Sequence, residues 1–382
     1  MKTQSIIGIA VVVILIIAVG AVVGFGALPK STNTTSISSA TSSTSTVVST
    51  SRPTSTSTST SSQGKTGQFA MGATDPPIAA SGVSDAKVAY NGVAVHNASS
   101  ASNSGWVTIN ATGTIDLMNS VNVSQTIAEA TIQSGTYDMA RINIVSGTVV
   151  YNHANYTAAI ASGTINATLQ QTAQVNSSAP SEAIIDLRTF IINSGNSTSP
   201  QFIISASAKS TAEPPRAVTS ASLQVGAKTT LEGQAWWTAF VDQTSSKVVI
   251  TSATLTNGSL NLALKNTGNA TANLQTVIVT PISAAGSASA SLPDSLTGSA
   301  VFELSSSGSM QESNTLQGVA LLTSIGTQVS AASSATLNYT GTISLGFGLS
   351  GVLQITGIVS GQQYLITCMG ANTYSSIVVV AQ

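Results

Sequence analysis

Hydrophobic and polar residues follow three successive patterns along the chain. Residues 6–28 are a run of 23 positions without a charge, long enough as a helix to cross a hydrocarbon core about 30 Å thick. The next segment, 31–62, has 25 Ser or Thr residues in 32 positions and no apolar stripe. From about residue 68 onward, short runs alternate apolar and polar residues, which is typical of half-buried β-strands. The pattern therefore predicts a transmembrane helix, a disordered Ser/Thr stalk and a mainly β remainder.

The apolar run favours an uncleaved anchor at 1–29. The apolar region of a secretory signal is shorter, about 7–15 residues, and the sequence Gly24-Phe25-Gly26 is a poor cleavage site. One Lys flanks the run on each side, so the positive charges do not orient it. A removed signal and a buried helix of a soluble core stay as alternatives. We expect residues 6–28 to contact membrane lipid and the C-terminal bulk to lie outside the cell.

The stalk, placed at 30–67, has the composition of an O-glycosylated segment, with a bare flexible linker as the alternative. N-glycosylation sequons point to the same location. Eleven of the 22 Asn residues begin Asn-x-Ser/Thr, whereas this Ser/Thr content gives about six by chance. Beyond Asn33 in the stalk, the candidate glycosylation sites are Asn97, Asn110, Asn122, Asn155, Asn166, Asn176, Asn196, Asn257, Asn269 and Asn338.

Residues 68–217 contain the first series of predicted strands. No segment here keeps a period of 3.6, so we expect an antiparallel β-sandwich. Asn91-Gly92 indicates a hairpin turn, and Ser124 is positioned to cap one short helix through Ile132. The expected strands are 83–90, 106–109, 114–117, 142–150, 184–187 and 202–206.

Five motifs of this segment carry a family resemblance: GVSDAKVAYNGVAVH, GW, TIDLM, SGTYDMARINI and AIIDL. Residues 75–210 resemble the domain of unknown function 4382 family. The resemblance implies an extracytoplasmic protein of an archaeon or bacterium, often anchored by lipid, and it assigns no activity. A helix anchor in place of a lipidated Cys departs from that pattern and favours an archaeal origin.

A second β domain is predicted at 230–382, after a linker at 218–229 that follows Pro214-Pro215. LNLALKNTGNATANLQTVIV and SGQQYLITCMGANTYSSIVV resemble Ig-like adhesion-type modules of microbial surface proteins, which implies an Ig-like β-sandwich. Residues 283–299 read as a loop rich in Ala, Ser and Gly. The expected strands are 235–241, 247–255, 259–265, 274–279, 336–345, 351–358, 363–368 and 375–380.

Composition excludes several classes of protein. Charged residues are 7% of the chain, 12 basic and 13 acidic, against about 25% in an ordinary domain. So few cations cannot form the basic face that nucleic-acid binding needs. Cys368 is alone, which excludes a disulfide scaffold and indicates a buried, inert thiol. The surface must be wetted by the 111 Ser and Thr residues and by amides, which suits a cell envelope or an acidic medium.

The residues offer little material for catalysis. His96 and His153 are the only histidines, so a metal site would need Asp116 or Asp138 as further ligands, and an imidazole satisfied by protein hydrogen bonds is favoured. Glycoside hydrolysis needs two facing carboxylates, and four acids are candidates for them. One of the four, Asp186, fits a local ion pair with Arg188 better. No nucleophile elbow, calcium loop or phosphate loop occurs. We therefore expect no enzyme activity, no cofactor and no metal. The four acids are Asp116, Asp138, Glu182 and Asp186.

Aromatic residues give the remaining binding candidates. Either Trp236 or Trp237 is positioned to stack on a sugar or a partner surface; the alternative puts one ring in the core and the other against the neighbouring domain. Trp106 is expected in the core, and Arg141 is expected to pair with Asp138 or Asp116.

The sequence thus predicts a membrane-anchored extracellular glycoprotein with a structural, adhesion or interaction role. Its expected partners are membrane lipid and, beyond that, glycans or other envelope proteins. A polysaccharide- or small-ligand-binding surface module is the alternative, and a cell-wall hydrolase is the least favoured.

Overall fold

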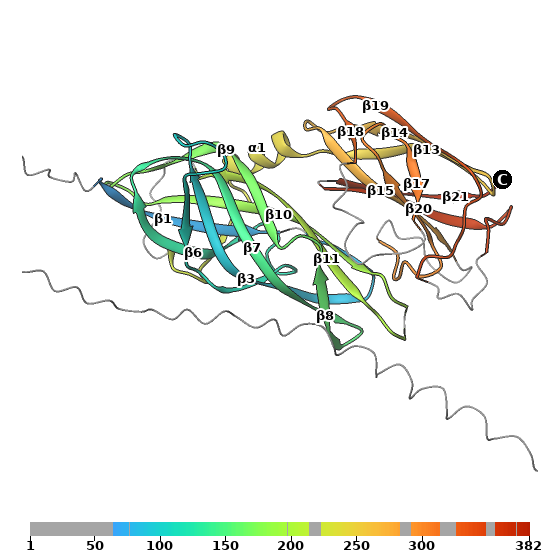
Figure 1. The fold of residues 1–382 in the computed structure, drawn as a ribbon, viewed down its shortest axis with the longest axis horizontal. Coiled ribbons are helices and arrows are strands. Elements are labelled where there is room, and N and C mark those ends of the chain that lie inside the picture. Colours follow the sequence, from blue (N-terminus) through green and yellow to red (C-terminus); the bar gives the residue numbers. More distant parts are fainter. Residues whose placement is uncertain are drawn as a thin grey trace, which may run out of the picture. The chain divides into compact units, whose positions relative to one another are not determined.

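The computed structural model describes residues 64–75, 77–196, 198–213, 223–282, 292–313, 326–348, 356–371 and 373–382. These residues contain 21 strands and one α-helix, which confirms a mainly β protein (Figure 1). Within the same ranges no helix is long and apolar enough to cross a membrane. The predicted anchor, the stalk and Asn33 lie outside the described residues.

The first twelve strands form one sheet. Its order is β12-β6-β1-β10-β11-β8-β7-β3-β4, with β2 on β10, β5 on β3, and β9 on both β11 and β7. The pairs of β10 with β1 and β2, and of β11 with β8 and β9, are parallel, so the sheet is mixed and the antiparallel prediction is wrong for these pairs. The strands are β1 (Thr66–Thr74), β2 (Ile78–Ala79), β3 (Val83–Asn97), β4 (Trp106–Ile109), β5 (Gly113–Asp116), β6 (Val123–Gln133), β7 (Gly135–Tyr151), β8 (Ala154–Ile160), β9 (Thr164–Val175), β10 (Ser181–Asn193), β11 (Phe202–Ala212) and β12 (Lys228–Thr230).

This sheet encloses a single apolar core. Alternate side chains of β1, β3, β6, β7 and β10 point to the same interior, among them Phe69, Val88 and Ile185. Two side chains join strands on the two sides of that interior: the Tyr90 hydroxyl donates to the Ile127 carbonyl at 2.7 Å, and the Gln125 amide donates to the Thr114 carbonyl at 3.1 Å. The sheet therefore curls until its β6 and β3–β5 sides meet around one core.

Two local predictions in this domain are wrong. The helix expected from Ser124 to Ile132 is strand β6, paired with β1 on one side and β12 on the other. Its β-branched residues pack well on a pleated surface, and ladder bonds on both sides outweigh the capping signal. The hairpin expected at Asn91-Gly92 is absent, because β3 runs straight through it with a shift of register against β7 between Tyr90 and Val93. These residues form an irregularity within the strand rather than a turn.

The later strands form two sheets around a second core. One sheet has the order β13-β14-β19, and the other has β17-β16-β15-β20-β21 with β18 on β15. Apolar side chains of both sheets share one cluster, which includes Leu262, Phe302 and Tyr364. Hydroxyl groups connect the two sheets, since the amides of Val248 and Ile250 donate to Thr373 and Ser375. The strands are β13 (Val248–Thr256), β14 (Ser259–Asn266), β15 (Ala272–Pro281), β16 (Ala300–Leu304), β17 (Met310–Glu312), β18 (Thr327–Val329), β19 (Ser334–Thr340), β20 (Gln363–Gly370) and β21 (Thr373–Val380).

The segment between the two cores differs from its prediction. Lys228 and Thr229, expected in the linker, and Thr230, expected to begin the second domain, form β12 and extend the first sheet. Residues 235–241, expected as a strand, begin the helix α1 (Ala235–Thr244). Trp237, Phe240 and Thr244 are its buried residues, and their spacing places them on one helical face. Part of the predicted linker (218–222), the start of the predicted loop (283–291) and most of the predicted strand 351–358 lie outside the described residues.

Residues 62–382 form one compact unit, and a third apolar cluster connects the two cores. Phe190 and Ile192 of β10 pack there with Ile278, Val301 and Met369 of the second domain. Nearby, the Asn193 side-chain amide donates to the Asp294 carbonyl at 3.0 Å, and the Leu296 amide donates to the Asn193 carbonyl at 2.9 Å. The outer face of β10 is therefore part of the contact between the domains.

Candidate functional site

His96 lies at the end of β3, where β4 and β7 flank it. Its side chain is 2% exposed. Nδ1 lies 2.7 Å from an oxygen of Asp138, and Nε2 lies 2.9 Å from the Ala101 carbonyl oxygen. Both partners accept hydrogen bonds, so both ring nitrogens must carry a proton for both bonds to form. This confirms the prediction of an imidazole satisfied by the protein, and the doubly protonated ring is the form that makes both bonds.

Trp106 and Arg141 complete this corner. The Arg141 guanidinium lies 3.8 Å from the centre of the Trp106 ring, and the His96 and Trp106 ring centres are 5.2 Å apart. The Arg141 Nε donates to the Asn166 side chain at 2.7 Å, so the prediction that Arg141 pairs with Asp138 or Asp116 is wrong. Trp106 is half-buried rather than in the core, and its ring is occupied by Arg141. The stacking of its guanidinium on the indole explains why the charged residue Arg141 is stable on strand β7.

The hydrogen bond to Asp138 first, and then the one to Ala101, raise the pKa of His96 above its ordinary 6.5. A raised pKa means that the folded chain binds this proton more tightly than the unfolded chain does. The resulting stabilisation is fully present below pH 6.5 and is lost as the pH rises through the folded pKa.

We expect the melting temperature to fall as the pH rises through that window, with faster amide hydrogen exchange in the 98–105 loop that His96 holds. Asp138→Asn is expected to move the transition to lower pH, because the amide keeps an acceptor and loses the charge. The check is a series of melting curves and exchange rates from pH 5 to 9. Identical pH profiles for wild type and Asp138→Asn would contradict the assignment.

A second polar cluster lies on the outer face of β10 and β11. Arg188 donates from Nε and Nη2 to the same oxygen of Asp186, at 3.1 and 2.7 Å. Asp186 is 1% exposed, so the predicted ion pair is confirmed, but it is covered rather than placed at an exposed strand end. Lys209 faces Asp186 across the ladder between the two strands. The cluster thus joins two cations to one buried carboxylate.

Burial controls the titration of this cluster. Loss of solvent raises the pKa of Asp186, and Arg188 opposes that shift. Burial, with help from the neighbouring Arg188 charge, lowers the pKa of Lys209 to about 8, while Asp186 acts against it. The amine of Lys209 is therefore partly neutral in mildly alkaline solution, which is unusual for a lysine.

Asp75 is the most deeply buried acid of the first domain. It follows the end of β1 and is fully buried. Within the described residues its two carboxylate oxygens, and the Thr189 hydroxyl near them, have no hydrogen bond of normal geometry. Burial raises the pKa of Asp75 well above its ordinary 3.8. Neither Asp75 nor Lys209 was predicted as a site residue; the sequence signal for Asp75 was a single acid directly after the largely apolar segment of β1.

Replacing Asp75 by Asn is expected to raise the melting temperature at pH 8 and to change it little at pH 4. An acid with a raised folded pKa contributes stability that is lost as the pH rises from its unfolded pKa through the folded one, and an amide keeps the shape of the protonated acid without that loss. Melting curves at the two pH values test this. A lower melting temperature at pH 8 would mean that the carboxylate itself is required.

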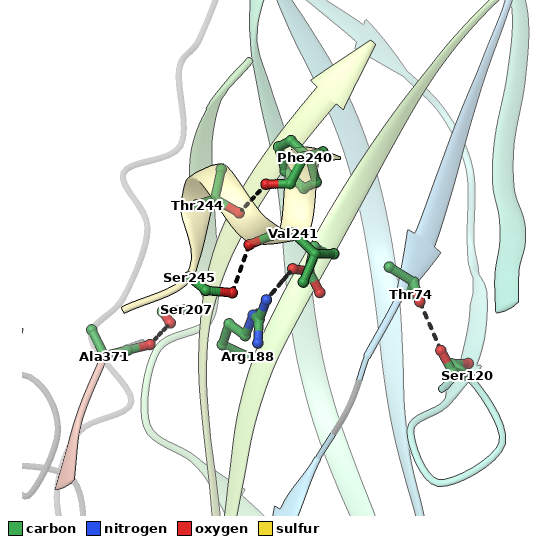
Figure 2. A network of polar contacts seen from close by, with 10 residues as sticks. Thr74, Ser120, Arg188, Ser207, Phe240, Val241, Thr244, Ser245 and Ala371 are labelled. Carbon is green, nitrogen blue, oxygen red and sulfur yellow. Dashed lines mark hydrogen bonds and ion pairs between the residues drawn. The ribbon is translucent and has the colours of Figure 1, made fainter. Parts of the chain in front are cut away.

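Helix α1 covers part of this outer face. Trp237 and Phe240 pack on Ile184 of β10 and on Leu231, with 5.4 Å between the two ring centres. Figure 2 shows the polar contacts around it: the Arg188 ion pair, the bond of Thr244 to the Phe240 carbonyl, that of Ser245 to the Val241 carbonyl, and that of Ser207 to the Ala371 carbonyl. The helix packs on the same face of β10 as the buried carboxylate, and Ser207 of β11 bonds to the second domain nearby.

The structure separates the two candidate stacking residues. Trp237 is 5% exposed and belongs to the packing of α1. Trp236 is half-buried, stands edge-on to Trp237 with 6.0 Å between ring centres, and donates its indole N–H to Gln234 at 3.0 Å. Of the two, Trp236 is the more exposed. The expectation that one ring is buried is thus confirmed, although helical spacing rather than strand alternation separates the two.

A small hollow of about 20 Å³ lies beside Arg188 of this ion pair. Its lining comes from both domains and includes Arg188, Ser205, Ser207 and Gln275. Ligand pockets commonly measure about 300–1,000 Å³, so this hollow is small for an organic ligand.

The other candidate acids and histidine are dispersed. Asp116 accepts hydrogen bonds from Asn119 in its own turn. His96 pairs with Met139 near the start of β7, whereas His153 follows the end of that long strand. In the part of the chain that the structure describes, no group of three His, Cys, Asp or Glu side chains is placed to hold a metal ion. Glu182 is buried near Gly72, and burial raises the pKa of the Cys368 thiol to about 12, as expected for an inert cysteine.

The sequon asparagines lie on the surface. Of the ten that the structure describes, nine are exposed, Asn97 is partly exposed and none is buried. By contrast Asn193 and Asn266, which are not in sequons, are buried and use their amides to bind backbone carbonyls. Accessibility therefore agrees with the predicted glycosylation sites without establishing their use.

Comparison with known proteins locates a family match in the first domain. No curated protein matches the chain. The matched segment begins at the start of β1 and ends in β11, so it contains the His96 corner and the Asp186–Arg188 pair. The resemblance inferred from the motifs is thereby confirmed: residues 66–210 match the family described as domain of unknown function (DUF4382).

Proposed function

We propose that this protein is a membrane-anchored extracellular glycoprotein of the cell envelope, with a structural, adhesion or interaction role. The order of its segments supports the proposal: an apolar run at 6–28 precedes a Ser/Thr-rich tract, and β domains follow. In this arrangement the tract would hold the β domains away from the bilayer. An archaeal source agrees with a helix anchor.

The observation that carries the proposal is the placement of the sequons. Ten sequon asparagines on the two β domains all keep out of the core, as attached glycans require. The low charge agrees with it, since sugars and hydroxyls would supply the hydration that Lys and Glu supply elsewhere.

We also infer that the described β domains are two β-sandwiches, the second of Ig-like type. Two sheets around one core, with the order β13-β14-β19 opposite β17-β16-β15-β20-β21, support this for the second domain. The curled twelve-stranded sheet of the first domain is a more closed variant of the same packing. Many cell-surface domains share the sandwich architecture, which suits an interaction role.

The alternative, a polysaccharide- or small-ligand-binding surface module, depends on Trp236. Trp236 is the more exposed of the two predicted stacking residues, and its indole N–H donates to Gln234. Loss of glycan-array binding in Trp236→Ala would favour this alternative, provided that the variant keeps the wild-type melting temperature.

Protease treatment of intact cells tests the location. We expect an added protease to remove the β domains from the full-length protein and to leave a short membrane fragment that contains residues 6–28. Glycopeptide mass spectrometry of the cell-derived protein tests the glycosylation. A protein that is protected in intact cells and carries no glycan would overturn the proposal.

A further inference from the structure

The ten sequons differ in how the fold presents them, and this inference rests on the proposed function. Two of them, at Asn176 and Asn196, lie outside the strands, after β9 and β10, whereas Asn97 is the last residue of β3 and pairs with Tyr137, so that the rest of its sequon lies in the loop that follows. Three others, at Asn155, Asn166 and Asn338, lie inside strands. The remaining four lie in turns or loops.

The first three share one local geometry. The sequon hydroxyl donates to the Asn side-chain oxygen: Ser99 to Asn97 at 2.7 Å, Ser178 to Asn176 at 2.6 Å, and Thr198 to Asn196 at 2.8 Å. The backbone amide of the same Ser or Thr donates to that oxygen at 3.0 Å in all three. The chain thus folds around each Asn oxygen in a compact Asx turn.

This geometry commits the side-chain oxygen of each Asn to donors of its own sequon. In Asn176 and Asn196 a third donor, the amide of Ala179 or Ser199, also reaches the oxygen. At Asn97 the nitrogen lies beside Gly135 of β7, 3.8 Å from the position that a Cβ on that glycine would take. At all three sites the Asn and the hydroxyl of its sequon are therefore already held together in the folded chain.

The strand sequons are presented differently. Asn155 and Asn166 pair with Val150 and Arg141 of β7, and Asn338 pairs with Asn261 of β14. The side-chain oxygen of Asn166 also accepts a hydrogen bond from the Arg141 guanidinium. An enzyme that must enclose both the Asn and the hydroxyl two residues later would first have to pull the strand from its ladder, which requires local unfolding.

We propose that Asn97, Asn176 and Asn196 are the preferred N-glycosylation sites of the folded protein. The donor is a saccharide activated as a lipid-linked phosphate or pyrophosphate. A C1–N bond forms to Nδ2, the C1–O bond to the phosphate breaks, and the phosphate leaves with that electron pair. The Nδ2 proton passes to a base of the transferase.

Glycosylation of the purified full-length protein in detergent tests the proposal. A purified oligosaccharyltransferase with a lipid-pyrophosphate saccharide donor is added to the folded protein, and site occupancy is measured by glycopeptide mass spectrometry at early times. We expect the three Asx-turn sites to be modified at least about tenfold faster than Asn155, Asn166 and Asn338, because strand sites require local opening. Synthetic peptides of the six sites give the intrinsic rate of each sequon, and the expected ratio holds after division by these rates.

The urea-unfolded chain is the matched control. Unfolding is expected to abolish the difference between the two groups, and equal normalised rates in the folded protein would overturn the proposal. Asn176→Gln should remove one glycan from the intact mass of the folded product, whereas Asn166→Gln should remove none. Since the assay supplies its own transferase, its outcome is separate from the proposed function, which fails if the cell-derived protein carries no glycan.

Discussion

Replacing Arg188 by Ala is expected to lower the free energy of unfolding by about 3–5 kcal/mol at pH 7, because it leaves the Asp186 carboxylate buried without its ion-pair partner. Asp186 is 1% exposed and receives both Arg188 bonds on one oxygen. Lys209 lies opposite Asp186 on β11 and still offsets part of the carboxylate charge, so we expect a loss at the lower end of that range. Urea unfolding of the full-length protein in detergent measures the loss.

A double variant separates charge from packing. Asp186→Asn combined with Arg188→Met removes both charges and keeps most of the side-chain volume, so its loss is expected to be less than half that of Arg188→Ala. The loss in Arg188→Ala should also shrink at pH 4, where Asp186 takes up a proton and its burial is no longer that of a charge. An equal loss in the single and double variants at pH 7 would refute the electrostatic explanation.

Trp237→Ala is expected to lower the free energy of unfolding by about 3–5 kcal/mol, the usual range for truncating a buried aromatic side chain. Trp237 fills the contact between α1 and the sheet, against Phe240, Ile184 and Leu231. A ten-residue helix is marginal by itself, so α1 should detach when this contact is lost. Hydrogen exchange should therefore accelerate in residues 235–244 before it changes in β3 and β7.

Trp236→Ala is the matched control for this result. The side chain is half-buried and bonded to Gln234, so its removal should have a much smaller effect on stability and leave the exchange of α1 nearly unchanged. Equal losses in the two variants would mean that the helix is held by its whole aromatic pair. The comparison also shows why a test of ligand stacking must use Trp236 alone, since loss of Trp237 disturbs the helix itself.

The period-two pattern was sufficient to place most strands. Predictions at 106–109, 259–265 and 363–368 agree with β4, β14 and β20 to within about two residues, because each strand has one buried and one more exposed face or lies in a fully apolar run. The pattern gave no information on which strands pair. The parallel pairs of β10 with β1 and β2 join distant segments, and no local signal in the sequence encodes such contacts.

Local signals failed where tertiary contacts outweighed them. Ser124 resembles a helix cap, yet the segment is held as a strand between two neighbours. Residues 235–241 contain aromatic and β-branched residues typical of strands, yet Trp237 and Phe240 at helical spacing meet an apolar patch of the sheet. In both cases the surface against which the segment packs determined its conformation.

Polar partners were predictable over short separations in sequence and less so over long ones. The Asp186–Arg188 pair was predictable because the two residues are neighbours on one strand face. Asp138 was named beside His96 only as a further ligand of a disfavoured metal site, and its hydrogen bond to that histidine was not predicted. The contact of Arg141 with Trp106 and Asn166, and the burial of Asp75, depend on strand registers that the sequence does not reveal.

The segment 223–244 has a practical consequence for work on the isolated family domain. Residues 66–210 match the family, but β12 pairs with β6 and α1 covers Ile184 beyond that end. A recombinant fragment that ends at residue 210 would expose the backbone of β6 and the apolar patch around Ile184 on β10. Exposed strand edges and apolar patches both promote aggregation. Extending the fragment through Thr244 retains both covers, so the domain suited to expression is longer than the domain defined by sequence comparison.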